Sequence, residues 1–186
     1  MSYWQDHGIL AVLVDGGFFN NINHHNYPLD LEKVFKALNP QGLALMRNYY
    51  YDCKPYVGPE QAEKDIEKLS RYESFLSYVQ QIPQTECKLG RLQKIDDTYV
   101  QKGVDTLITI DIVTFATKHL VTHLTLLTGD DDLIPAIQAA KNEGIIVTVY
   151  TTKQSVTSSM RASADVVHII DDKWLKQAMR QQQKIR

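Results

Sequence analysis

The stretch ILAVLVDGG, residues 9–17, is the part of the sequence that decides the fold. An unbroken apolar run without polar alternation is typical of a strand that is buried on both faces, as in a parallel sheet. Asp15-Gly16-Gly17 ends the run and predicts a tight turn directly after the strand. This first strand therefore brings Asp15 to the edge of a sheet.

A second stretch, LTLLTGDDD at residues 124–132, has the same form, a short apolar strand that ends in carboxylates. Similar runs predict further strands at residues 43–51, 86–92, 145–150 and 166–170, with a short hairpin partner near Tyr99. Apolar residues at helical spacing predict helices at 29–38, 61–82, 103–120, 133–143 and 158–164, and a terminal helix from residue 172. Strands that alternate with helices indicate an α/β fold with a mainly parallel sheet.

Length, composition and charge limit the class to which the protein can belong. The chain has 186 residues, of which 44% are hydrophobic and 23% are charged, and this predicts one globular domain over 1–186 whose last part, 172–186, is a helix and tail. A net charge of -2 excludes a strongly basic coat-like or histone-like protein. Two cysteines are too few for a disulfide framework and lack zinc spacing. Without a signal or membrane-spanning segment, we expect a soluble, cytoplasmic protein.

The acids at the strand ends carry the functional prediction. In open parallel sheets, ligands bind beyond the carboxyl ends of the strands, which is where Asp15 and Asp130 are expected. Carboxylates repel one another, so a cluster of them at neutral pH indicates a bound cation. Each acid alone has a structural explanation: Asp15 suits a turn, Asp105 suits the first turn of a helix, and Asp132 suits an N-cap before Leu133.

Asp111 is the acid that a purely structural interpretation explains least well. At about 100° per residue it lies on the same helix face as Val104, Ile108 and Phe115. A core-facing carboxylate is costly without a partner. It is either a buried acid satisfied by hydrogen bonds or a functional residue, which reaches the metal cluster directly or supports the side chains that bind the metal.

Other side chains give weaker signals. No Gly-x-Ser-x-Gly elbow, Walker-type loop or base beside a cysteine indicates covalent catalysis or nucleotide hydrolysis. The adjacent histidines His24 and His25 are more typical of a solvated loop than of a catalytic pair. The run Tyr49–Tyr51 is more typical of core packing than of base stacking. Contacts with phosphate are plausible for several basic residues, with solvated surface charge as the alternative: Arg47, Lys88, Arg91, Lys94 and Lys102.

Several motifs, in this order and spacing, resemble the NYN domain, and more narrowly its LabA-like, DUF88-type branch. The resemblance spans about residues 9–170 and rests on Val14-Asp15-Gly16-Gly17, Tyr51-Asp52-Cys53, Leu89-Gly90-Arg91-Leu92, Lys102-Gly103-Val104-Asp105, Asp111, Thr128-Gly129-Asp130-Asp131-Asp132 and Ala164-Asp165. It implies a PIN-like, Rossmann-like three-layer α/β/α sandwich that binds divalent metal and cleaves RNA internally. The acids that match the family's are Asp15, Asp105, Asp130 and Asp132.

The chain departs from the family pattern at two positions. Phe18 stands where many relatives of the wider class carry Asn, and this leaves Asn20 or Asn23 as candidates to position the substrate. Asp131 replaces a small residue in the Gly-Asp-x-Asp turn, and we expect it to be exposed to solvent rather than a ligand.

These observations predict an endoribonuclease that uses Mg²⁺ or Mn²⁺ to activate water against single-stranded RNA. Asp111, Thr128 and Asn20 are expected to support the metal ligands, and Lys102, Arg91 and Arg47 to bind the nucleic acid. DNA remains open as the substrate, as does a homo-oligomer, and no membrane partner is expected. The alternatives are an adaptor of the same fold without turnover and a phosphotransfer domain of the haloacid-dehalogenase or receiver type. The first of those phosphotransfer types needs an Asp-x-Asp after the first strand, which Asp15-Gly16-Gly17 does not offer.

Overall fold

The structure is a computed structural model that describes residues 8–24, 27–55, 63–95 and 98–180, with the backbone alone for residues 92–101. The strands are β1 (Ile9–Asp15), β2 (Ala44–Cys53), β3 (Thr85–Ile95), β4 (Thr98–Lys102), β5 (His123–Leu127), β6 (Ile146–Thr151) and β7 (Val166–Ile169). The helices are α1 (Gly16–Ile22), α2 (Leu31–Ala37), α3 (Glu63–Gln81), α4 (Val104–Thr117), α5 (Ile134–Asn142), α6 (Ser158–Ser163) and α7 (Asp172–Ala178), with a 3₁₀ turn, η2 (Asp131–Leu133), before α5.

All seven strands form one sheet in the order β4-β3-β2-β1-β5-β6-β7. Neighbouring strands run parallel except for the hairpin of β3 and β4. The chain builds outward from β1 on one side through β2 and β3, and then returns to add β5 on the other side. The strand order therefore reverses between β1 and β5, and ligands of open α/β sheets bind at such a reversal.

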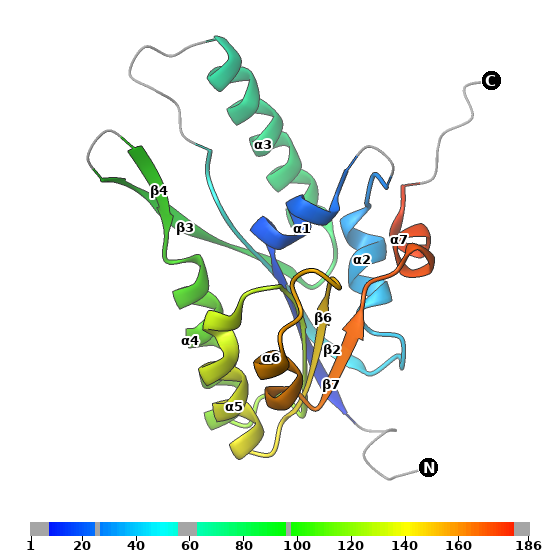
Figure 1. Cartoon of the computed structure of the whole chain (residues 1–186). Coiled ribbons are helices and arrows are strands. Elements are labelled where there is room, and N and C mark those ends of the chain that lie inside the picture. Colours follow the sequence, from blue (N-terminus) through cyan, green and yellow to red (C-terminus); the bar gives the residue numbers. More distant parts are fainter. Residues whose placement is uncertain (1–7, 25–26, 56–62, 96–97, 181–186) are drawn as a thin grey trace, which may run out of the picture.

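Helices cover both faces of the sheet and form the three layers that the sequence predicts (Figure 1). One hydrophobic core joins the sheet to α4, α5 and α6, and the other joins it to α1, α2, α3 and α7. Tyr49 and Tyr51 belong to the first core and Tyr50 to the second, so all three pack in the interior, as expected for alternating residues of a strand. None of the described helices is both long and apolar enough to cross a membrane.

Helix α1 replaces the tight turn predicted after the first strand. The Asp15 side chain caps this helix by accepting a hydrogen bond from the backbone N–H of Phe18. A Cβ on Gly16 would lie 2.6 Å from the carbonyl oxygen of Tyr51, so only glycine lets the chain begin a helix this close to β2. The two glycines, which are poor helix formers, hid the helix in the sequence.

The hairpin of β3 and β4 extends away from the rest of the sheet (Figure 1). Its base is pressed against the start of α4, because a Cβ on Gly90 would lie 2.8 Å from the side chain of Val104, the first residue of α4. Gly103 then turns the chain into α4 with a φ of 88°, a left-handed conformation that favours glycine. The hairpin and the first turn of α4, which carries Asp105, are thereby held together.

Candidate active site

Asp15 ends β1, Thr128 directly follows β5, and the two side chains are hydrogen-bonded to each other. The Thr128 hydroxyl donates to Asp15 Oδ2 at 3.3 Å and also accepts from the backbone N–H of Asp130 at 3.1 Å. Thr128 is fully buried, with 1% of its surface exposed. It therefore fixes the carboxylate of β1 relative to the loop that follows β5.

Asp130 begins the loop after β5 and caps the 3₁₀ turn. Its Oδ1 accepts a hydrogen bond from the backbone N–H of Asp132 at 2.9 Å. The N-cap role expected of Asp132 thus belongs to Asp130, because the turn starts two residues earlier than the predicted helix. Asp132 itself lies in the first turn with an exposed side chain.

Asp105 approaches this loop from the first turn of α4. Partial burial raises the pKa of Asp105, and the neighbouring carboxylates of Asp130 and Asp132 raise it further. Burial also raises the pKa of Asp15, and the charge of Asp105 raises it further. Hydrogen bonds from Phe18, Gly17 and Thr128 lower the pKa, but by less than burial raises it. Asp105 is therefore near enough to Asp15, Asp130 and Asp132 for their like charges to repel it.

A surface hollow of about 350 Å³ lies over the carboxyl ends of β1 and β5. Both Asp15 and Asp130 line it, with Asn21 of α1 and Ser155 of the loop after β6. A Cβ on Gly129 would lie 2.6 Å from the ring of Phe18, so this glycine lets the aromatic ring form the wall. The sequence analysis missed Asn21, because recognising it requires the helix α1, where it lies one turn after Gly17.

The four acids have no positive partner within the described part of the chain, since none of the ion pairs there includes Asp15, Asp105, Asp130 or Asp132. The described residues also contain no group of three or more His, Cys, Asp or Glu side chains placed to enclose a metal ion. Mg²⁺ commonly uses one or two protein carboxylates and completes its shell with water and substrate phosphate. Asp15 and Asp130, the two acids that line the hollow, are enough for that open mode of binding.

The sequence matches the NYN domain family over residues 9–171. The chain belongs to the NYN domain family. Its PIN-like fold agrees with a solved structure, a protein of unknown function from Vibrio parahaemolyticus, at a TM-score of 0.65 and 19% identity over 92% of this chain and 97% of that one. The uncharacterized protein y4oD of Sinorhizobium fredii is 32% identical over 78 residues, which are 40% of this chain and 36% of that protein. The matched segment thus spans about a third of this relative.

Asp111 of the NYN domain lies in the core face of α4, as its spacing predicts, and its partners come from β2 and β3. Its carboxylate accepts hydrogen bonds from Lys88 Nζ at 2.7 Å and from the Tyr51 hydroxyl at 2.6 Å. Lys88 also stands 5.0 Å from the centre of the Tyr49 ring. The charge of Asp111 is therefore satisfied inside the fold, and Lys88, a candidate for binding phosphate, is its counter-ion.

Other polar residues near the acids serve the fold of the NYN domain. Asn20 hydrogen-bonds the buried carboxylate of Asp52, and Asn23 accepts from the backbone N–H of Leu29 at 2.9 Å. Neither lines the hollow, which leaves Asn21 as the asparagine that does. Asp131, expected to be solvent-exposed, is half-buried and accepts a hydrogen bond from the Thr157 hydroxyl at 2.9 Å, which ties the loop to α6.

The basic residues predicted to bind nucleic acid occupy two different places. Arg91 and Lys102 are exposed and face each other across the base of the hairpin, next to the start of α4. Like charges placed directly opposite are unfavourable in a sheet, so an anion between them would relieve their repulsion. Arg47 instead pairs with Glu86 at 2.8 Å and lies four residues before the strand position opposite Asp15, about 13 Å away.

His24 packs edge-on against Tyr27, with ring centres 5.3 Å apart, while His25 lies outside the described residues. Lys94 lies in the part of the hairpin whose side chains are not described. Cys53 and Cys87 are both free thiols, and burial raises the pKa of each, so neither is activated as a nucleophile. Of the groups considered, the carboxylates are therefore the candidates for chemistry at this site.

Proposed function

We propose that this NYN domain is a metal-dependent endoribonuclease that hydrolyses phosphodiester bonds of single-stranded RNA at the carboxyl ends of β1 and β5. The nuclease-like character of its family supports hydrolysis in general. The observation that supports the proposal is that two uncompensated carboxylates, Asp15 and Asp130, line one hollow where the strand order reverses, with Asp105 close to both. The narrower assignment to the LabA-like branch stays a prediction.

The carboxylates of Asp15, Asp105 and Asp130 would hold Mg²⁺ or Mn²⁺, with Asp132 near enough to add its charge. A divalent cation bound there would supply an acidified water and stabilise the charge that develops on the attacked phosphate. Thr128 orients Asp15, and the N-cap hydrogen bond orients Asp130, so two of the three proposed ligands are held in place by the chain itself. Positioning of this kind reduces the cost of reorganising the site during the reaction.

The chain's own residues would also bind the RNA. Phe18 and Asn21 of α1 form one side of the hollow, where an aromatic ring and an amide suit an unstacked base. Arg91 and Lys102 would contact backbone phosphates next to the Asp105 end of the site. RNA is preferred to DNA in this proposal on the family resemblance alone, and the experiment includes both.

The test is cleavage of an internally labelled single-stranded RNA, and of the same sequence as DNA, by extensively purified protein with Mg²⁺, with Mn²⁺ or with EDTA. The proposal expects internal cleavage of the RNA that depends on metal and is lost in Asp130→Asn. Asparagine is as good an N-cap as aspartate, so this variant is expected to keep the fold. Equal cleavage by wild type and variant contradicts the proposal, and RNA binding without any cleavage, unaffected by EDTA, favours an adaptor.

A further inference from the structure

The loop that joins β6 to α6, residues 152–157, brings one side chain to the hollow over the acids. Ser155 is the residue of this loop that lines the hollow, together with Asp15 and Asp130. Because β5 lies between β1 and β6 in the sheet, the loop approaches from the side away from β1 and its helix α1. Ser155 is partly exposed to solvent, so its hydroxyl can meet a ligand in the hollow.

Two contacts hold this loop against the loop that carries Asp130. Gly129 directly precedes Asp130, and a Cβ at Gly129 would lie 2.7 Å from the Cβ of Ser155. Directly after Asp130, Asp131 accepts a hydrogen bond from the Thr157 hydroxyl at 2.9 Å. Ser155 is therefore held in place beside Asp130, and a contact that it makes with a ligand has a defined position relative to the acids.

Thr152 occupies the acceptor side of the Ser155 hydroxyl. The Thr152 hydroxyl donates to Ser155 Oγ at 3.0 Å and accepts from the Ser155 backbone N–H at 3.2 Å. The backbone N–H groups of Ser155 and Val156 also donate to the Thr152 carbonyl oxygen, at 3.2 and 3.0 Å, which closes the turn. A serine hydroxyl has one hydrogen of its own. No hydrogen bond among the described residues takes up that hydrogen, so Ser155 can donate it to a ligand.

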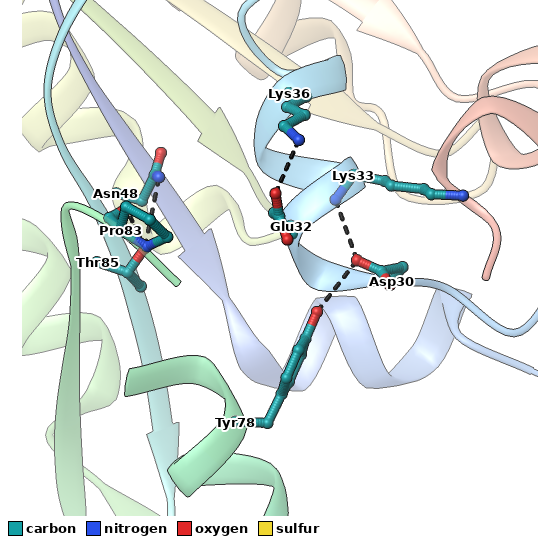
Figure 2. A network of polar contacts seen from close by, with 8 residues as sticks. All are labelled: Asp30, Glu32, Lys33, Lys36, Asn48, Tyr78, Pro83 and Thr85. Atoms are coloured by element: carbon teal, nitrogen blue, oxygen red, sulfur yellow. Dashed lines mark hydrogen bonds and ion pairs between the residues drawn. The ribbon is translucent and has the colours of Figure 1, made fainter. Parts of the chain in front are cut away.

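Hydroxyl groups in another part of the fold donate within the chain. Figure 2 shows a polar network around α2 and the turn from α3 to β3. There, the Tyr78 hydroxyl donates to Asp30 at 3.1 Å, and the Thr85 hydroxyl donates to the carbonyl oxygen of Pro83 at 3.2 Å. The hydroxyl of Ser155 differs from these two because its hydrogen points to no acceptor of the described fold and lies at a hollow.

The hollow offers many hydrogen-bond acceptors and few donors. The ionised carboxylates of Asp15 and Asp130 can only accept. Among the described residues that line the hollow, only Asn21 and Ser155 have side chains that can donate. A phosphate group presents charged oxygens, and hydrogen bonds to charged oxygens are stronger than those between neutral groups. A phosphate in this hollow would therefore be expected to use these donors.

The chemistry of the two donors divides their roles. The Asn21 amide both donates and accepts, which suits the edge of a base. Ser155 already accepts from Thr152 and offers its hydrogen, which suits a phosphate oxygen. We propose that the Ser155 hydroxyl, oriented by Thr152, donates a hydrogen bond to a non-bridging phosphate oxygen of RNA in the hollow. This inference rests on the proposed function, because it takes RNA as the ligand of the site.

The experiment compares the affinity of wild type, Ser155→Ala and Ser158→Ala for a fluorescent single-stranded RNA in Mg²⁺. Affinity is measured from the anisotropy directly after rapid mixing, so the result does not depend on cleavage. We expect Ser155→Ala to bind about tenfold more weakly, the effect of one lost hydrogen bond to a charged group. Ser158 is exposed at the start of α6 and does not line the hollow, so Ser158→Ala is the matched control and should bind like wild type.

An affinity of Ser155→Ala equal to that of wild type overturns the inference, and so does a wild type that fails to bind RNA. Cleavage, measured separately, distinguishes the inference from the proposed nuclease. RNA binding that needs Ser155 but is followed by no cleavage contradicts the nuclease and supports the inference. Metal-dependent cleavage with RNA binding unchanged in Ser155→Ala supports the nuclease and overturns the inference.

Two further comparisons locate the contact. Thr152→Val removes the hydroxyl that orients Ser155, while the Thr152 carbonyl oxygen still closes the turn. We expect RNA binding to weaken a few-fold in this variant and to recover in Thr152→Ser, and wild-type affinity in Thr152→Val would contradict the orienting role.

RNAs that carry one 2′-deoxynucleotide at successive positions test the other acceptor that RNA offers, the 2′-hydroxyl. The loss of affinity caused by Ser155→Ala should be the same with each of these RNAs. A single deoxy position that abolishes the loss would assign Ser155 to the 2′-hydroxyl and contradict the phosphate contact.

Discussion

Two acids on the same helix, Asp105 and Asp111, stand in opposite circumstances. Asp111 is buried, and Lys88 and Tyr51 satisfy its carboxylate. Asp105 is mostly exposed; its partial burial raises its pKa, and the neighbouring carboxylates of Asp130 and Asp132 raise it further. The charge of Asp111 is balanced within the fold, whereas the charges of Asp105 and its neighbours are not balanced by any cation of the described residues. A buried acid is thus a weaker sign of function than an uncompensated one.

The largest expected effect is on RNA cleavage, which we expect to depend on Asp15 of the acid cluster far more than on Asp111. Asp15→Asn keeps the N-cap of α1 through its oxygen and removes one ligand charge. Its NH₂ group takes the place of the oxygen that accepted from Thr128, so the amide would donate to the Thr128 oxygen instead. We expect RNA cleavage to fall at least a hundredfold in this variant, while Asp111→Asn, measured well below its melting temperature, changes cleavage per folded molecule only a few-fold. Rates are compared under single-turnover conditions. Equal losses in the two variants would erase the distinction.

The second effect is on stability, where we expect the change at Asp111 to matter more than the change at Asp15. Asp111→Ala leaves the Lys88 ammonium and the Tyr51 hydroxyl without their acceptor, and we expect a loss of about 2 kcal/mol in the free energy of unfolding, since Lys88 is partly solvated. Asp15→Asn is expected to stay within about 0.5 kcal/mol of wild type. Urea denaturation with EDTA present measures both. A fully stable Asp111→Ala would show that the Asp111 network contributes little to the fold.

The sequence predicted the strands because unbroken apolar runs need no tertiary information, and the acids at their ends followed from the parallel topology. It also predicted the burial of Asp111 from helical periodicity, but not its partners, which come from β2 and β3. The same limit applies to Asp131, whose partner Thr157 lies in a later part of the chain. Helix α1, and with it Asn21, was missed because its stability comes from the Asp15 cap and from packing rather than from intrinsic helix propensity.

A third effect concerns pH. Because the folded-state pKa of Asp105 is raised above 3.8, its contribution to stability is fully present below pH 3.8 and is lost as the pH rises through the folded pKa. In EDTA at pH 7, Asp105→Asn should therefore melt at a higher temperature than wild type, and added Mg²⁺ should narrow the difference. Glu63→Gln removes an acid from the first turn of α3 and should slightly lower the melting temperature. An Asp105→Asn variant that melts like Glu63→Gln would argue against repulsion at the site.

The smallest effect concerns RNA affinity. Arg91→Ala or Lys102→Ala should weaken binding a few-fold and reduce the dependence of log K on log salt by about 0.7 for each phosphate that the variant no longer neutralises. Arg47→Ala is the matched control, because its charge is paired with Glu86 at the other end of the strand, and it should leave the slope unchanged. The measurement is fluorescence anisotropy with single-stranded RNA at several salt concentrations. An equal change in slope for Arg47→Ala would contradict the proposed interface.

The most direct test of the central claim is anomalous diffraction from a crystal of this protein soaked in Mn²⁺. We expect a peak of anomalous density between the carboxylates of Asp15, Asp105 and Asp130. We expect none beside Asp111, because Lys88 already balances its charge. Absence of a peak among these three acids at saturating Mn²⁺, or a peak at Asp111 instead, would contradict it.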